Sequence, residues 1–121
     1  MGNITIEKAG YIIACYSDLL TLQEQKALRH HRSTLKLADV KDARLTGMYL
    51  ETGWLSDDPL ILNYLSEGYV QFILRCAERI IKDNPDKVYF NLCPVCKKLA
   101  RTPHAKQCRF CGHDWHKALL N

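Results

Sequence analysis

Apolar side chains recur at helical spacing through the first two thirds of the chain. The clearest stretch runs from Glu67 to Lys82, where apolar and polar positions alternate with the period of an α-helix. The apolar face of this predicted helix holds Val70, Ile73, Ala77, Ile80 and Ile81, broadened by Tyr69, Leu74 and Cys76. A helix with one apolar face must pack against other helices, so the pattern predicts a helical body with a buried core.

Two further helices are predicted upstream. Residues 7–20 carry apolar side chains at helical intervals, and Thr21 with Glu24 forms a capping box that starts a new helix running to about Lys36. In this second helix, Leu28, His31 and Leu35 share the face expected to be buried. The opposite, polar face holds Gln25, Arg29, Arg32 and Lys36.

The segment after this helix has weaker signals. Gly47 and Gly53 flank the apolar residues 48–50, and no element is assigned there with the same clarity. Ser56, Asp57, Asp58 and Pro59 then supply a cap, an acidic first turn and a proline at the first helical position. These residues predict that another helix begins near Pro59.

Four cysteines form the most informative motif. Cys93 and Cys96 make one Cys-x-x-Cys pair, and Cys108 and Cys111 make a second pair eleven residues later. Each pair can wrap one tight turn around an ion, and the intervening segment is long enough to bring the two pairs face to face. The spacing therefore predicts a tetrahedral metal site with four thiolate ligands. Such a site is closed to water and substrate, so its expected role is structural.

The order of residues around these pairs resembles the small zinc ribbons found in many bacterial proteins. The resemblance covers residues 88–117, from a predicted strand at 88–92 to the residues that follow the second pair. It implies a small β zinc ribbon that holds Zn²⁺, and implies no activity. Lys97 departs from the pattern, because such ribbons often carry glycine there, as Gly112 does in the second turn. No characterised family is recognised for the helical part.

Other interpretations of the cysteines carry different weight. Iron in a rubredoxin-like site uses the same four ligands, and His113 or His116 offers a fourth ligand for a Cys₃His site. A disulfide framework is disfavoured, because the N-terminal region has no basic stretch followed by an apolar run and a cleavage motif. We therefore expect a reducing, cytoplasmic environment, in which Cys15 and Cys76 serve as small buried apolar residues.

Charge is concentrated in the C-terminal part. Residues 1–87 hold 11 Lys and Arg against 12 Asp and Glu, whereas residues 88–121 hold 6 against 1. An excess of cations favours nucleic acid or an acidic protein as a partner, although four thiolates on a Zn²⁺ ion would offset part of it. The candidate nucleic-acid-binding residues are Lys97, Lys98, Arg101, Lys106 and Arg109. Phe110 and Trp115 could stack on bases beside these cations or could form the miniature core of the ribbon.

No catalytic constellation accompanies these features. Arg29, His30, His31 and Arg32 form a cluster, but consecutive histidines on a helix point about 100° apart and cannot share one metal ion in the ordinary way. The sequence has no Gly-rich phosphate loop and no Gly-x-Ser-x-Gly motif, and no small-molecule substrate is evident. We therefore expect a protein that acts by binding and not by catalysis.

The sequence predicts a mostly α protein of two parts, a helical body at residues 1–87 and a zinc ribbon at residues 88–121. Its composition, 47% apolar and 25% charged, is ordinary for a soluble protein, and no membrane association is expected. The favoured function is that of a small nucleic-acid-associated or regulatory adaptor. The alternative is a protein-binding inhibitor or immunity-type protein with a purely structural zinc site, whose partner would contact Tyr49 and Trp54.

Overall fold

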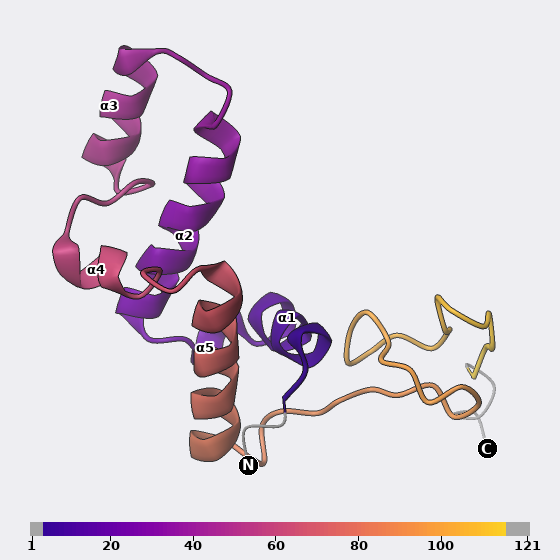
Figure 1. Ribbon diagram of the computed structural model, residues 1–121. Helices are drawn as coiled ribbons and strands as arrows, with labels where there is room; N and C mark the ends of the chain where they lie inside the picture. The colour runs from indigo at the N-terminus through magenta and orange to yellow at the C-terminus, as the bar shows by residue number, and fades with distance from the viewer. Residues whose placement is uncertain (1–3, 116–121) are drawn as a thin grey trace.

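The computed structural model describes residues 4–115, and this part of the chain is mostly helical (Figure 1). Its elements, in chain order, are α1 (Ile6–Cys15), a 3₁₀ turn η1 (Ser17–Leu19), α2 (Leu22–Leu37), α3 (Ala43–Thr52), α4 (Pro59–Asn63) and α5 (Tyr69–Asp83). Across these residues no helix has both the length and the apolar character needed to cross a membrane. Residues 84–115 follow as an extended segment without a regular helix or strand.

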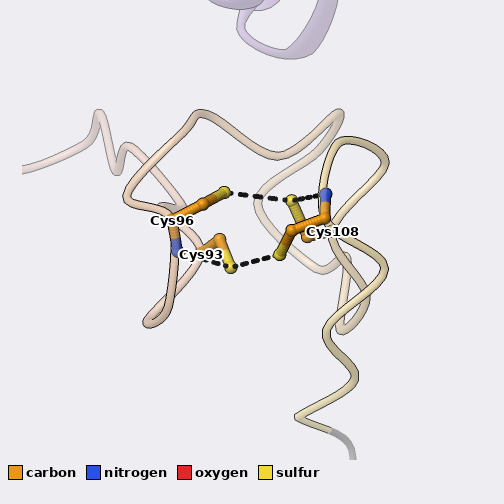
Figure 2. A group of neighbouring side chains, drawn as sticks. Cys93, Cys96 and Cys108 are labelled. Atoms are coloured by element: carbon orange, nitrogen blue, oxygen red, sulfur yellow. Dashed lines mark hydrogen bonds between the residues drawn. The ribbon is translucent and has the colours of Figure 1, made fainter.

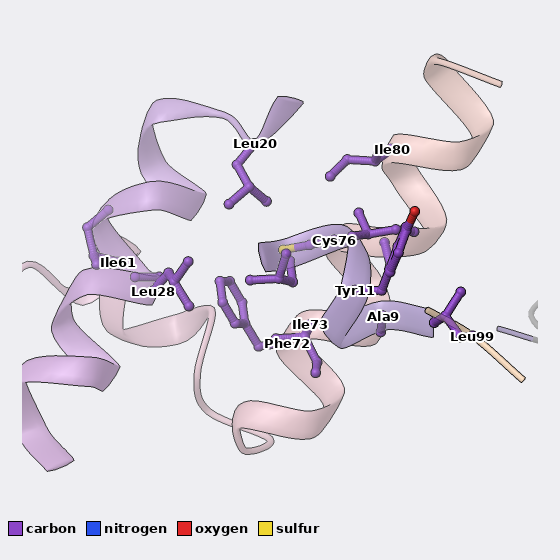
Figure 3. Close-up of a cluster of buried hydrophobic side chains, with 14 residues drawn as sticks. Ala9, Tyr11, Leu20, Leu28, Ile61, Phe72, Ile73, Cys76, Ile80 and Leu99 are labelled. Carbon is purple, nitrogen blue, oxygen red and sulfur yellow. The ribbon is translucent and has the colours of Figure 1, made fainter. Parts of the chain in front are cut away.

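The core forms where α1 packs against α5, with α2 and α4 closing one side (Figure 3). Ile12 of α1 and Ile80 of α5 are fully buried, as expected from the helical pattern. Among the described residues, Phe72 has the largest fully buried side chain, at 1% exposed, whereas Val70 is 42% exposed. The assignment of Val70 to the buried face was therefore wrong, because the apolar face of α5 is centred between Phe72 and Cys76.

The predicted capping box starts α2 as expected. The Thr21 hydroxyl accepts a hydrogen bond from the Glu24 amide at 3.1 Å, and the Glu24 carboxylate accepts one from the Thr21 amide at 2.9 Å. Glu24 is nevertheless buried, because the same carboxylate pairs with Arg79 of α5, whose Nε donates to Glu24 Oε2 at 3.1 Å. Arg79 also donates to the Leu19 carbonyl at 3.1 Å. The pair joins α2 and η1 to α5 through Arg79, a residue outside the apolar face predicted for this helix.

This buried pair predicts a pH-dependent contribution to stability. Burial acts to raise the pKa of Glu24, but the hydrogen bonds from Arg79 and the Thr21 amide outweigh it, so the pKa is lowered. A carboxyl group with a lowered pKa in the folded state stabilises the fold above its unfolded pKa of about 4.3, and this contribution is lost as the pH falls through the folded value.

We expect Glu24→Gln to lower the free energy of unfolding by about 2 kcal/mol at neutral pH, because it removes a charged partner from Arg79. Urea unfolding at neutral pH and at about pH 3 checks this, since the gap between parent and variant should narrow in acid. At a given pH the cysteines are protonated equally in both proteins. The difference between the two free energies of unfolding therefore reports on Glu24 alone. Glu78→Gln, at an exposed position of α5, is the control. A gap that stays constant with pH would contradict the assignment.

Helix α3 extends away from the core beside the outer half of α2 (Figure 1). No residue of α3 is buried, and Gly47 lies within the helix instead of flanking it. The helix ends at Gly53, whose φ of 83° is a left-handed cap that glycine adopts without strain. Because α3 does not cover the outer half of α2, Leu35 is 63% exposed, and its expected burial beside Leu28 was wrong.

Two other helix boundaries differ from expectation. The predicted helix over residues 7–20 is divided, since α1 ends at Cys15 and η1 follows. Asp58 caps α4 through a hydrogen bond from the Leu60 amide at 2.9 Å and Pro59 occupies its first position, as predicted, but the helix is short and ends at Asn63. The sequence therefore predicted correctly where α4 begins. It did not predict where α1 and α4 end, because helix length depends on packing against other segments.

The C-terminal segment lies against α1 on the side away from α5 (Figure 1). Leu99 is buried in the core cluster, and Val88 and Phe90 pack against that cluster. The Tyr11 hydroxyl donates to the Tyr89 carbonyl at 2.6 Å. These contacts dock the C-terminal segment on the helices. The domain boundary at residue 87 stays a prediction.

Candidate metal centre and its surroundings

Four cysteine sulfurs converge in the C-terminal segment (Figure 2). The Sγ atoms of Cys93 and Cys111 lie 3.7 Å apart and those of Cys96 and Cys108 lie 3.4 Å apart. All four ligand atoms lie within 4.8 Å of one another. The separations exceed the S–S bond length of about 2.05 Å, so the cysteines are free thiols placed around a common point.

The spacing of the sulfurs fits a tetrahedral ion. Zinc–sulfur bonds of about 2.3 Å place the sulfurs of a tetrahedron about 3.8 Å apart, close to the two separations above. Thiolate ligands suit zinc and also iron, so the donor set does not identify the ion. The structure therefore supports a site that could hold a metal ion through Cys93, Cys96, Cys108 and Cys111, with the identity of that ion left as a prediction.

The two Cys-x-x-Cys turns have the same backbone construction. The Lys97 amide donates to the Cys93 carbonyl at 2.9 Å, and the Gly112 amide donates to the Cys108 carbonyl at 3.1 Å. Both donors have a positive φ, 65° at Lys97 and 78° at Gly112. Lys97 is the only non-glycine residue with a positive φ among those described, and it takes on a conformation that costs roughly 1–2 kcal/mol outside glycine. The departure from the ribbon pattern at Lys97 thus leaves the turn geometry intact.

Backbone amides surround the first sulfur of each pair. Cys93 Sγ accepts from the Val95 and Cys96 amides at 3.4 and 3.5 Å, and Cys108 Sγ accepts from the Phe110 and Cys111 amides at 3.3 and 3.4 Å. Such donors stabilise negative charge on sulfur. The Cys111 amide, opposed by burial and assisted by the Phe110 amide, lowers the pKa of Cys108 to about 6. The backbone of each turn thus favours a thiolate at the first cysteine of the pair, because the pKa of Cys93 is lowered as well as that of Cys108.

A short antiparallel pairing closes the base of each cysteine turn. Leu92 pairs with Leu99 and Gln107 pairs with Asp114, each as an isolated antiparallel bridge. No strand forms in residues 84–115, so the strand expected at 88–92 is absent and a β ribbon is not shown. A buried asparagine adds to the bridges, since Asn91 Nδ2 donates to the carbonyls of Thr102 and Ala105 at 2.9 and 2.8 Å. Nothing in the sequence singled out Asn91.

His113, close to the second pair in the sequence, lies outside the sulfur cluster. The His113 ring stacks on Trp115 at a centroid distance of 6.0 Å, and only its carbonyl contacts a ligand residue, accepting from the Cys108 amide at 2.8 Å. His116 lies outside the described residues. Within residues 4–115, the group that could hold a metal consists of the four cysteines alone. Trp115 is half-buried against His113 and not fully exposed.

The two remaining cysteines and the two consecutive histidines contact other parts of the fold. Cys76 is buried in the core, where burial raises its pKa to about 12, and Cys15 is half-buried with its thiol 3.6 Å from the Arg101 carbonyl. His30 Nδ1 accepts a hydrogen bond from the Ser56 amide at 2.9 Å, and the His31 ring stacks on Tyr69 at 4.2 Å. The two histidines therefore point to different neighbours, as expected for consecutive helical positions.

The five candidate cations occupy different surroundings. Lys98 and Arg109 converge on Phe110, with Lys98 Nζ 4.8 Å and Arg109 Cζ 4.9 Å from the ring centroid. Phe110 is 49% exposed, so it is not the core of this segment. Lys97 and Arg101 are exposed and Lys106 is half-buried, and none of these three has a described contact with Phe110.

The other candidate contact residues lie at the far end of the molecule. Trp54 is 47% exposed, and its ring centroid lies 6.4 Å from that of Tyr49, which is half-buried. Arg29 Cζ and Lys36 Nζ of α2 lie 5.3 and 5.8 Å from the centre of the Trp54 ring. The structure thus brings the two predicted residues together, although it does not test whether a partner binds them.

Comparison with protein-family models, with curated proteins and with solved structures found no match for this chain. The functional inferences below therefore rest on the chemistry of the described residues.

Proposed function

We propose that the protein is a non-enzymatic, zinc-stabilised binding protein whose C-terminal segment binds single-stranded nucleic acid. The observation that carries this proposal is the exposed Phe110 ring flanked by Lys98 and Arg109. An exposed aromatic ring can stack on an unpaired base, and cations beside it can neutralise the adjoining phosphates. A duplex keeps its bases stacked on one another, so single strands are the expected ligand.

Zinc would have a structural role in this function. The four cysteines would hold the ion, and both Lys98 and the Arg109–Phe110 pair lie within two residues of a ligand. Fixing the two turns therefore fixes the position of the stacking ring relative to the two cations. The four-ligand site leaves no position for substrate, which is why we propose binding and not catalysis.

The proposal predicts a specific salt dependence. Single-stranded oligonucleotide should bind at low salt, and Lys98→Ala/Arg109→Ala should reduce the slope of log affinity against log salt by about 1.4, at about 0.7 for each lost phosphate contact. Phe110→Ala should weaken binding by about fivefold or more, since stacking on one base is worth about 1–3 kcal/mol, and should leave the slope unchanged. Fluorescence anisotropy with single- and double-stranded oligonucleotides at several salt concentrations measures both quantities.

Matched controls separate the site from general effects. Lys26→Ala/Lys41→Ala removes the same charge from the helical body, and Leu60→Ala removes an apolar side chain that is exposed on α4. Both should bind as the parent does. The proposal fails if the parent binds no oligonucleotide at low salt, or if these controls weaken binding as much as the site variants do. A wider variant that adds Lys97→Ala, Arg101→Ala and Lys106→Ala tests whether the contact extends over all five candidate cations.

A further inference from the structure

A second basic surface lies on the helices, remote in sequence from the cysteine cluster. Arg29, Arg32 and Lys36 recur at helical spacing on one face of α2, and together with Trp54 they line a groove of about 610 Å³. Leu20 and Leu28, which are buried, also line this groove. Among residues 4–115, none of the three cations forms a salt bridge, so their charge is available to a ligand.

An apolar pocket continues this groove toward α3. Met48, Tyr49 and Thr52 of α3 line a pocket of about 280 Å³, and Lys36 and Trp54 border both hollows. Met48 is exposed, and methionine is a side chain that adapts its shape to a partner. Aromatic side chains such as Tyr49 and Trp54 contribute strongly to protein interfaces. The combined surface therefore offers a row of cations beside a small apolar pocket.

We propose that this surface binds an acidic segment of a partner protein that carries an apolar side chain. Carboxylates of the segment would pair with Arg29, Arg32 and Lys36, and its apolar side chain would enter the pocket beside Trp54. Arginine suits this role because its guanidinium group can pair with a carboxylate through two parallel hydrogen bonds. This proposal is independent of the metal ion and of nucleic-acid binding by the C-terminal segment.

The charge of the helical body favours an acidic protein over nucleic acid at this surface. Residues 1–87 carry 11 Lys and Arg against 12 Asp and Glu, so the helical body lacks the general positive field that attracts a polyanion. A short acidic and apolar segment needs only the local cations and the pocket.

The test uses a display library of random-sequence peptides selected on the full-length, zinc-loaded protein. We expect the parent to enrich peptides that combine several Asp or Glu residues with a large apolar residue. One enriched peptide is then synthesised and titrated. Arg29→Ala/Arg32→Ala and Trp54→Ala should each weaken it by about tenfold or more, and replacing its acidic residues with their amides should have a similar effect. Lys26→Ala/Arg44→Ala, which removes two exposed cations outside the groove, should change affinity by less than about twofold.

Three outcomes of the peptide experiment would overturn the proposal. The first is that no acidic peptides are enriched, and the second is that an enriched peptide binds the groove variants as tightly as it binds the parent. The third is that a single-stranded oligonucleotide competes with the peptide for the parent and does not bind the groove variants. Light scattering of the free protein measures whether two copies associate. A dimer that forms in the parent and is lost in the groove variants would also contradict the proposal, because a second copy would then occupy the groove. We expect each variant to retain the fold, because Arg29, Arg32 and Trp54 are all exposed. Thermal unfolding of each variant, followed by circular dichroism, checks this.

Discussion

Replacing Cys96 with serine should reduce bound metal from one ion per chain to well below one. A hydroxyl group is a much weaker ligand than a thiolate, and the free energy of metal binding is also the free energy that folds a small metal site. We expect the amide signals of residues 88–115 to collapse toward unfolded positions in a heteronuclear NMR spectrum. Most of the helical circular dichroism should remain, because every buried member of the core cluster except Leu99 comes from the chain before residue 84.

Cys15→Ser is the matched control, because Cys15 lies outside the sulfur cluster. It should keep a full complement of zinc after reconstitution, as measured by elemental analysis. If the parent itself holds neither zinc nor iron after careful reconstitution, or if Cys96→Ser holds as much metal as the parent, the four-cysteine assignment is wrong. Comparing zinc with iron during reconstitution also decides between the two ions that the donor set permits.

Replacing Phe72 with alanine should lower the free energy of unfolding by about 3–5 kcal/mol. Phe72 is fully buried and packs near the rings of Tyr64 and Tyr69, at centroid distances of 6.3 and 6.4 Å. Removing the ring leaves a cavity at the junction of α2, α4 and α5. The expected loss is a large part of the free energy of unfolding of an ordinary domain. Urea unfolding followed by circular dichroism measures the change.

Val70→Ala is the control for this prediction, since Val70 lies two residues away in the same helix and is exposed. Its expected cost is within about 0.5 kcal/mol, as for most exposed substitutions. If Phe72→Ala and Val70→Ala lower the free energy of unfolding by similar amounts, the face of α5 that packs on the core is not centred near Phe72.

The sequence was sufficient where local chemistry determines structure. The capping box of Thr21 and Glu24 and the start of α4 at Asp58 and Pro59 depend on residues within a few positions of one another, and the four cysteines converge across 18 positions. In each case the required donors and acceptors are visible in the order of residues. The convergence of the four cysteines, which could hold a metal ion, was therefore predicted correctly, whereas the ion itself stays a prediction.

The sequence was insufficient where the outcome depends on distant partners. The helical period indicates which residues share a face, but it does not say whether another element covers that face. Leu35 is exposed because α3 leaves the outer half of α2 uncovered, and Arg79 is half-buried because Glu24 faces it from another helix. The hydrogen bond from Tyr11 to Tyr89 joins residues far apart in the chain, so no local pattern could indicate it.

The position of α1 between α5 and the C-terminal segment restricts the order in which the chain can fold. The buried residues of α1, among them Ile12 and Tyr11, pack chiefly against α5, and Tyr11 also donates a hydrogen bond to Tyr89 in the C-terminal segment. During synthesis the apolar face of α1 therefore stays uncovered until α5 and residues 88–99 have been made, whereas the cysteine turns need only neighbouring residues. Helix α1 is thus made before α5 but acquires its native contacts only after it, and in the interval its apolar face is accessible to chaperones and to misassociation.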